Sequence, residues 1–350
     1  MTFVDEKLDA PVAVVDSIDV EESNVMKPQV TALIDEATAS VLAGIDEFYI
    51  QQRIRWGEAI TQGCIEQKNI YDVFDKTSNT KVMEIQEESN DLSRCCCAPN
   101  HSFFAQFFLV DEVGNRVGTP VMTMEREGCD CCGGPCPKPF IGCWACKPQC
   151  ADKATLYSGD LASGGAIAGE FKGNRERTQL IGETVQPLGG GGFKPILQIM
   201  DRDDTSTENT KMFAATRGPT FFGGCSELCC DTKFGISQAK DGMEVPELKQ
   251  LSFGDYATIT KSKPKSITGA LREMFTDSDL YEVHFKITEV SPQQKANVLA
   301  AMVITDYMFF ERDNDMCAYR DDTIIITVCN CFCYGCVCPC NLYIPTKYNN

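Results

Sequence analysis

The stretch ITGALREMFTDSDLYEVHFKITEVSPQQKANVLAAMVITDYMFFE, residues 267–311, decides the fold of this chain. Its second half predicts a helix over residues 292–311. Ser291 and Gln294 have the spacing of a capping box, in which each side chain bonds the backbone of the other residue. Pro292 would take the first helical position, where its missing N–H leaves no hydrogen bond unmade. These local signals fix the start of the helix.

The predicted helix is apolar around its whole circumference. Every residue from Val298 to Ile304 is apolar, and Asn297 and Asp306 fall on opposite faces. Such a helix is buried, in protein or in lipid. Its uninterrupted apolar core is shorter than the roughly 18 residues of a membrane-spanning helix, so we expect burial inside protein. The residues that we expect to form this central or membrane-associated helix are Val298, Leu299, Met302, Val303, Ile304, Met308 and Phe309.

The first half of the stretch predicts a strand that leads into this helix. Val283, Phe285 and Ile287 alternate with polar residues, which is the period of a half-buried strand. Upstream, short apolar runs such as IYDVF and KVMEI are separated by turn residues, here 76–79, and FFAQFFLV, PILQIM, MFAAT and FGISQ add further strands. Repeated hairpins favour a mainly β fold, either a closed barrel or a sandwich.

Composition narrows the function classes. The 350 residues are 43% hydrophobic, enough for a sizeable core in one large domain or two ordinary ones. Lys and Arg total 32 against 50 Asp and Glu, which gives a net charge of −18. We therefore expect no nucleic-acid partner and no unaided attraction to anionic lipid. The opening MTFVDEK has no signal-peptide pattern and no glycine at position 2, which favours a cytosolic start.

Several longer motifs resemble the phospholipid scramblase family. They are TGALREMFTDSD, ITDYMFFE, FAQFFLVDEVGNRVG, VMTMEREGCDCC, RGPTFFGGCSELCC and FGISQAKDG. The resemblance implies a tubby-like architecture, a closed antiparallel barrel of about twelve strands around one central apolar helix. We expect a barrel over residues 46–311, with its central helix at 292–311. An acidic, mostly disordered tail with one short helix would precede it at 1–45, and a cysteine-rich tail would follow at 312–350.

The resemblance also implies a calcium site after TGALREMF. Scramblases carry a twelve-residue segment here that is proposed to bind calcium, and Asp277 and Asp279 match it. Glu282 offers a further carboxylate. Thr288 stands where the family pattern ends in an acidic residue, and calcium prefers six to eight oxygen ligands, so we expect low affinity. The alternative is that the two aspartates only shape the turn before the strand.

A first cysteine cluster lies where scramblases are thioacylated, directly after the TMER-like strand. The resemblance implies covalent palmitate on Cys129, Cys131, Cys132, Cys136, Cys143 and Cys146. Each buried methylene of an acyl chain contributes about 0.8 kcal/mol, so two or more chains would attach the protein firmly to a membrane. Four of these cysteines form two CxxC pairs with zinc-ribbon spacing, Cys129 with Cys132 and Cys143 with Cys146, and zinc is the alternative.

Past residue 311 the family similarity fades. The tail holds the β-prone run TIIITV followed by Cys329, Cys331, Cys333, Cys336, Cys338 and Cys340. We interpret it as a second acylation or membrane-contact segment, with metal binding as the alternative. Lys261, Lys263 and Lys265 form one basic patch, which we interpret as a solvated loop; Lys265 best matches a nuclear-import segment of some scramblases.

The function that the resemblance implies is calcium-responsive phospholipid scrambling, the ATP-independent, bidirectional movement of phospholipids between leaflets. The protein would act at the cytoplasmic face of a membrane, expected to be the plasma membrane, with homo-oligomers and protein partners as further expectations. It would not be a conventional enzyme, because His101 and His284 lie in no nucleophile or metal motif. The alternative is an acylated adaptor that binds phosphoinositides or proteins. A barrel that encloses its only long apolar helix offers no groove for lipid, so scrambling would require oligomerisation or withdrawal of the helix.

Overall fold

The structure, a computed structural model, describes residues 34–53, 68–90, 101–128, 145, 150–169, 179–203, 209–263, 279–311 and 316–346. The chain divides into two units, Met1–Thr31 and Ala32–Asn350, and every described residue belongs to the second.

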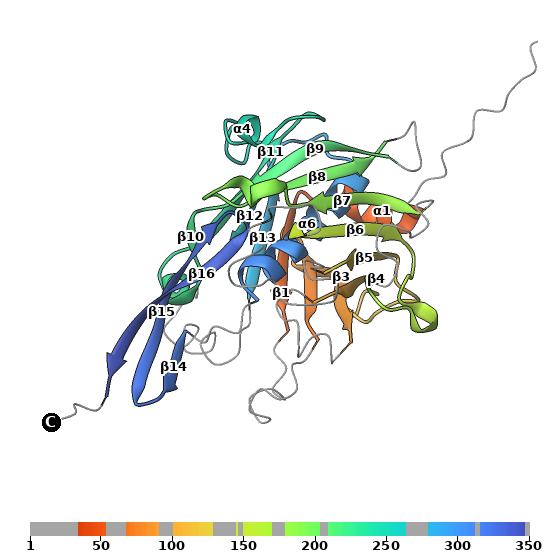
Figure 1. Cartoon of the computed structure of the whole chain (residues 1–350). Helices are drawn as coiled ribbons and strands as arrows, with labels where there is room; N and C mark the ends of the chain where they lie inside the picture. The colour runs from red at the N-terminus through yellow and green to blue at the C-terminus, as the bar shows by residue number, and fades with distance from the viewer. Residues whose placement is uncertain are drawn as a thin grey trace, which may run out of the picture. The chain divides into compact units, whose positions relative to one another are not determined.

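Antiparallel strands of this second unit close into a barrel (Figure 1). Around the barrel the order is β1, β13, β12, β11, β9, β8, β7, β6, β5, β4, β3 and β2, and β2 pairs with β1 again. The bounds are β1 Glu47–Gln52, β2 Ile70–Asp75, β3 Thr80–Ser89, β4 Phe103–Leu109, β5 Met122–Arg126, β6 Lys153–Ser158, β7 Leu180–Val185, β8 Ile196–Arg202, β9 Thr210–Arg217, β11 Thr232–Gln238, β12 Ala257–Lys261 and β13 Leu280–Phe285. The predicted twelve-stranded antiparallel barrel is confirmed.

Local sequence explains the first hairpin. The turn between β2 and β3 occupies the predicted residues 76–79, and the carboxylate of Asp75 accepts hydrogen bonds from the backbone N–H groups of Thr77 at 3.0 Å and Ser78 at 3.1 Å. Asn79 closes the turn with φ of 55°, a left-handed conformation that asparagine tolerates well. The short polar side chains of the turn therefore set the register of the two strands.

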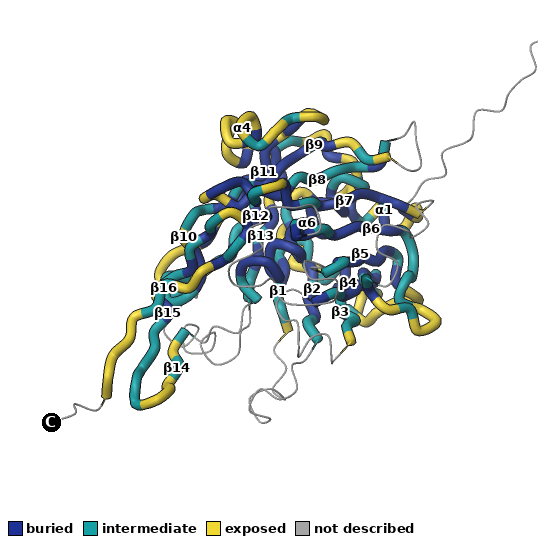
Figure 2. Tube along the Cα trace, viewed as in Figure 1, coloured by how far each residue is buried: buried dark blue, intermediate teal, exposed yellow. Residues whose placement is uncertain are grey.

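Helix α6, Pro292–Phe309, occupies the interior of the barrel (Figure 1). The side chains of Ser291 and Gln294 form the predicted capping box, and the helix ends two residues before the predicted Glu311. Buried residues surround the helix, because the barrel wall contacts each of its faces (Figure 2). All of the apolar residues predicted for the central helix are buried: Val298, Leu299, Met302, Val303, Ile304, Met308 and Phe309.

Polar groups fix the N-terminal half of α6 to the barrel. Lys295, buried at 2% exposure, donates from Nζ to the carbonyl oxygen of Ile45 at 2.6 Å and to that of Ala43 at 3.1 Å. Asn297 donates to Asp201 at 3.1 Å. Helix α1, Glu36–Ala43, lies within the 1–45 segment for which the sequence predicts one short helix, and Lys295 connects its C-terminal end to α6.

A second sheet is formed mainly by strands that follow α6. It consists of β10 Phe221–Phe222, β14 Cys317–Arg320, β15 Thr323–Cys333 and β16 Cys336–Pro345, and we call it the C-terminal sheet. Phe332 of β15 is fully buried, with its ring centroid 5.8 Å from that of Phe309 in α6. The segment that the sequence predicts only as a cysteine-rich tail is thus a folded sheet that packs against the end of the helix.

The remaining elements are short. They are α4 Val245–Leu248 and the 3-10 turns η2 Ser163–Gly165, η3 Leu188–Gly191 and η4 Gly224–Leu228. The glycine run at 189–192, predicted as a loop, forms η3 and the residue after it with positive φ throughout. None of the helices in the described part of the chain has the length and apolar character that crossing a bilayer requires.

Candidate functional site

The C-terminal half of α6 carries a buried acid. Asp306 is 1% exposed, and its carboxylate accepts hydrogen bonds from the hydroxyls of Tyr71, at 2.5 Å, and Tyr281. Burial and repulsion by Asp279 raise the pKa of Asp306 to about 6, although Lys261 and both tyrosines act in the opposite direction. A buried carboxyl group that titrates near neutral pH is typical of functional sites.

Lys261 is the cation of this site. It is the last residue of β12, and its Nζ lies 2.7 Å from Asp279 and 2.8 Å from Glu227. Burial alone would lower the pKa of Lys261, but the carboxylates of Asp279, Glu227 and Asp306 raise it well above its usual value. The Lys261 ammonium also lies 4.3 Å from the centroid of the Phe310 ring. We call Asp306, Lys261, Asp279 and Glu227, with Tyr71 and Tyr281, the acidic cluster.

The interpretation of Lys261 as part of a solvated loop is wrong. Lys261 is 8% exposed because it continues the inward positions of Ala257 and Ile259 on β12. Lys263 is exposed, as expected, and Lys265 lies outside the described residues. No local pattern marks Lys261 as buried, since its partners come from elements distant in sequence.

The structure separates the two described residues of the predicted calcium site. Asp279 faces the acidic cluster, whereas Glu282 lies on the other face of β13, where its carboxylate is 3.0 Å from Nζ of Lys76. Asp277 lies outside the described residues. Within the part of the chain that the structure describes, no three His, Cys, Asp or Glu residues are arranged to hold a metal ion. Calcium binding through Asp277, Asp279 and Glu282 stays a prediction.

A second buried carboxylate supports the same end of α6. Glu87 of β3 accepts a hydrogen bond from the Tyr307 hydroxyl at 2.7 Å and lies 3.2 Å from Nε2 of His101. Both Glu87 and His101 are buried, so this histidine belongs to the packing between β3, β4 and the helix. His284, by contrast, is on the outer face of β13, as its alternation predicts.

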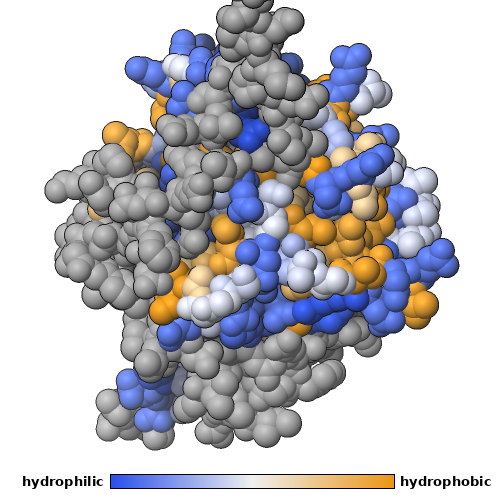
Figure 3. Space-filling view, turned by 90° about the vertical axis from the view of Figure 1, so that its right-hand side faces the viewer, coloured by the Kyte–Doolittle hydropathy of each residue, from blue (hydrophilic) through white to orange (hydrophobic). Residues whose placement is uncertain are grey.

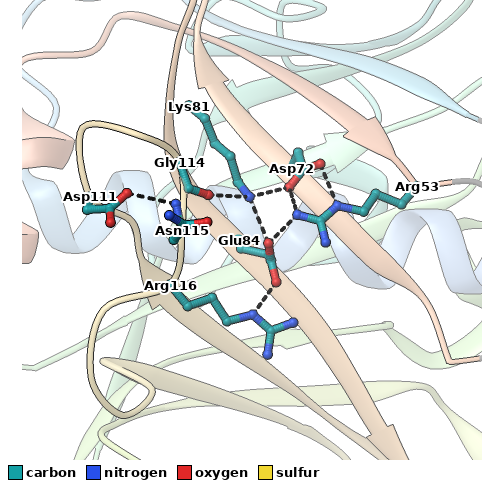
Figure 4. A network of polar contacts seen from close by, with 8 residues as sticks. All are labelled: Arg53, Asp72, Lys81, Glu84, Asp111, Gly114, Asn115 and Arg116. Carbon is teal, nitrogen blue, oxygen red and sulfur yellow. Dashed lines mark hydrogen bonds and ion pairs between the residues drawn. The ribbon is translucent and has the colours of Figure 1, made fainter.

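An ionic network covers the outer wall of β2 and β3 (Figure 4). Glu84, only 3% exposed, accepts hydrogen bonds from Arg53, Arg116 and, at 2.7 Å, Lys81. Burial alone would raise the pKa of Glu84, but the hydrogen bonds from Lys81 and Arg116 lower it. Lys81 also donates to the carbonyl oxygen of Gly114 at 3.1 Å, so the network fastens the loop after β4 to the barrel.

Two groups of cysteines stand out in the sequence. The predicted lipidation cluster, Cys129, Cys131, Cys132, Cys136, Cys143 and Cys146, lies outside the described residues. The C-terminal cysteines lie on β15 and β16, and none of the described cysteines forms a disulfide. Their register places Cys329 opposite Cys340, Cys331 opposite Cys338 and Cys333 opposite Cys336.

Sequence reasoning identified Asp279 but not the residues around it. Two signals in the sequence could have found them: Asp306 is an acidic residue within an apolar helix, and Tyr71 and Tyr281 are tyrosines within strands. Such residues are usually buried and hydrogen-bonded, as these three are. Only the barrel topology brings them together, because β2 and β13 both neighbour β1.

Comparisons with known proteins identify similar chains. A family model described as Scramblase matches residues 26–156 and 204–312, a region that includes α6 and ends before the three C-terminal strands. Phospholipid scramblase 1 of Mus musculus is 23% identical over 272 residues, covering 77% of this chain and 63% of that protein. Phospholipid scramblase 1 of Homo sapiens is 24% identical over 271 residues, covering 77% and 64%. Phospholipid scramblase 2 of Bos taurus is 21% identical, covering 77% and 70%. The match thus spans less than two thirds of either scramblase 1, and no solved structure matches.

Proposed function

The chain belongs to the scramblase family, and we propose that it moves phospholipids in both directions between the leaflets of a membrane without ATP. The observation that carries this proposal is the family match, which includes most of the barrel strands, though not β7 and β8, and the whole central helix. A lipid headgroup that crosses hydrocarbon without polar partners is opposed by several kcal/mol for each unsatisfied polar group, and a scramblase lowers that barrier. The protein would associate with phospholipid membranes, at the cytoplasmic face and in particular at the plasma membrane.

We propose that α6 stays inside the barrel during transport. Withdrawal into lipid would remove Lys295 from its two carbonyl acceptors and Asp306 from its two tyrosines. Lys or Asp at the centre of a membrane-spanning helix costs about 2.5–3.5 kcal/mol each. The sequence suggests that scrambling requires either oligomerisation or withdrawal of the helix, and these contacts favour oligomerisation. Hydrogen exchange on vesicle-bound protein tests this, since amides of residues 298–308 stay protected if the helix remains enclosed.

The calcium response is a further proposal, centred on Asp279. A calcium ion that binds Asp279 has to compete with Lys261, whose ammonium lies 2.7 Å from the same carboxylate. Binding would therefore loosen the acidic cluster and the contact between β13 and α6. Substitution Asp279→Asn should abolish the calcium dependence of transport, while Glu88→Gln, on β3 and paired with Lys68 outside the predicted calcium segment, serves as the control. Equal calcium responses in the wild type and the Asp279→Asn variant would contradict this assignment.

Attachment to the membrane is proposed to use palmitate on the cluster from Cys129 to Cys146. Hydroxylamine-sensitive acyl labelling of the protein from its native cells tests it. Stoichiometric zinc at Cys129, Cys132, Cys143 and Cys146 without an acyl label would favour the zinc alternative.

Reconstituted vesicles test the main proposal. Full-length protein is incorporated into vesicles with a labelled phospholipid, and the label in each leaflet is measured with and without calcium. Equilibration between leaflets above the rate of protein-free vesicles supports scrambling. Headgroup binding without transport would favour the alternative, an adaptor that binds phosphoinositides or proteins at the membrane.

A further inference from the structure

In the part of the C-terminal sheet nearest the β15–β16 turn, one face packs on the protein and the other does not. Cross-strand partners share a face, and successive residues alternate between faces. Asn330, Phe332 and Val337 are buried and define the packed face. The three opposed cysteine pairs of β15 and β16 alternate with them and lie on the other side, which we call the cysteine face.

The cysteine face continues beyond the thiols with large apolar side chains. Val328 occupies a bulge, after which Ile326 pairs with Leu342 and Ile324 with Ile344 on the same side. The neighbouring strands extend the face, since Tyr319 pairs with Ile324 and Phe221 pairs with Cys331. Phe221, Tyr319 and Leu342 are each more than half exposed.

The cysteine face carries no charge, although the chain has a net charge of −18. Each cross-strand position on it is occupied by Cys, Ile, Leu, Phe or Tyr. Burial and the neighbouring thiols raise the pKa of Cys329 and Cys331, so these side chains are neutral at pH 7 and behave as small hydrophobic groups. The side of the molecule shown in Figure 3 also exposes hydrophobic residues, which hydrophilic residues border and interrupt.

The edge of the sheet is protected against strand addition. Within the described residues β16 pairs with β15 alone, and it contains Pro339 and Pro345, which lack the backbone N–H that an added strand would need. A partner is therefore expected on the face and not along the edge.

The face is too small for a stable dimer with a second copy of this chain. The β15 strand has 11 residues, β16 has 10 and β14 has 4. At about 3.4 Å per residue and 4.8 Å per strand, β14, β15 and β16 together present roughly 400 Å². A stable protein interface buries about 800 Å² on each partner. Binding to a bilayer requires no such minimum contact area, because each apolar side chain can enter the bilayer separately. The cysteine face also has no charged side chain that would have to be desolvated.

We propose that the cysteine face of the C-terminal sheet is the surface that docks this protein on a lipid bilayer. This inference deepens the proposed function, because it assigns the surface that meets the membrane. Three of its four strands, β14, β15 and β16, lie beyond the family match, which ends at residue 312, so docking through them would be an addition of this chain to the scramblase barrel. In Figure 1 the β15–β16 hairpin extends away from the barrel, and its distal part is exposed in Figure 2.

Flotation of the full chain with vesicles tests the docking surface. Unacylated protein is mixed with neutral phosphatidylcholine vesicles, and the bound fraction is measured at low and high salt. We expect salt-independent binding. The double substitution Leu342→Asp with Ile344→Asp should weaken binding by roughly tenfold or more, since two apolar contacts are replaced by charges.

The matched control is the double substitution Asn341→Asp with Tyr343→Asp, which adds the same two charges to the same strand on its opposite face. Tyr343 is 61% exposed and lies on the opposite face. Binding that resembles the wild type supports the assignment, whereas equal losses in both variants would overturn it in favour of insertion of the whole hairpin. Far-UV circular dichroism and thermal unfolding establish that each variant keeps the barrel.

Three further outcomes overturn the inference. The first is unchanged flotation of the double variant, and the second is no binding of the wild type. The third is a dimer in sedimentation velocity that the double variant disrupts, with no vesicle binding. Transport is measured separately on protein incorporated with detergent, where docking is not required, so failed docking and failed scrambling are distinguished.

Discussion

The hydroxyl of Tyr71 on β2 lies 2.5 Å from a carboxylate oxygen of Asp306 on α6. This hydrogen bond joins the barrel wall to the C-terminal half of the enclosed helix, at a site where Asp306 is 1% exposed. Tyr281 donates to the other oxygen of the same carboxylate. The helix is therefore fixed by directional polar contacts as well as by apolar packing.

Asp306 should make the folded protein more stable in mild acid. Burial raises its pKa from 3.8 to about 6, so the folded chain holds a proton that the unfolded chain has released. Its contribution is complete below the unfolded pKa and is lost as the pH rises through 6. The free energy of unfolding of the wild type, relative to Asp306→Asn, should fall between pH 4 and 7 by on the order of 2 kcal/mol. A difference that stays constant or rises over this range would contradict the prediction.

Lys295→Met should be strongly destabilising. The change removes the donor to the carbonyl oxygens of Ala43 and Ile45 and leaves both acceptors without this partner, which costs about 2–4 kcal/mol. Chemical denaturation measures it. The control Lys211→Met removes an ammonium that is more than half exposed and 2.8 Å from Asp203, so its effect should stay within about 0.5 kcal/mol. Similar losses of unfolding free energy in both variants would mean that the burial of Lys295 is not the cause of the destabilisation.

Gly182→Ala should separate β7 from α6. A Cβ at Gly182 would lie 2.3 Å from the side chain of Asn297 and 2.3 Å from the carbonyl oxygen of Met200, so the helix or the strand must move. We expect a loss of about 2 kcal/mol or more, typical of an overpacked core. At Gly44 the nearest atoms would be 3.9 Å from the added methyl group, and Gly44→Ala should be tolerated. Equal thermal unfolding midpoints for the two variants would show that β7 and α6 accommodate the added methyl group at Gly182 without loss of stability.

Glu84→Gln should loosen the outer wall. The change removes a buried negative charge that three cations share, Arg53, Lys81 and Arg116, at a cost of about 2 kcal/mol. Because the pKa of Glu84 is lowered by folding, its contribution is present above the unfolded pKa of 4.5 and is lost as the pH falls. The difference in unfolding free energy between the wild type and Glu84→Gln should therefore become smaller at acidic pH. The control on the same strand is Glu88→Gln, whose side chain pairs with Lys68 and is 43% exposed.

The sequence predicted those features that depend on residues close together in the chain. Ser291, Pro292 and Gln294 determine the start of α6 by themselves, and an apolar surface around the helix requires burial on all sides. The β2–β3 hairpin follows from alternation and its turn residues. The barrel itself was predicted from the family resemblance, since hairpins alone allow a sandwich as well.

The polar interior could not be predicted in this way. The partners of Lys261 are Glu227, Asp279 and Asp306, which lie on different elements and meet only when β12 and β13 are adjacent in the closed barrel. The C-terminal sheet was missed for another reason. Its cysteines alternate with Asn330, Phe332 and Val337, and cysteine is compatible with either face of a strand, so alternation gave no contrast between a buried and an exposed side.

The pairing of β1 with β13 has a consequence for the synthesis of this protein. The first barrel strand, Glu47–Gln52, finds one of its two neighbours only in Leu280–Phe285, more than 200 residues later. A growing chain on the ribosome therefore keeps β1 as an unsatisfied sheet edge until most of the protein has been translated, and α6, which must fill the interior, emerges later still. Such long-range closure is slow and leaves aggregation-prone edges exposed. Closure of the barrel is thus completed only after the last barrel strand and the helix have left the exit tunnel.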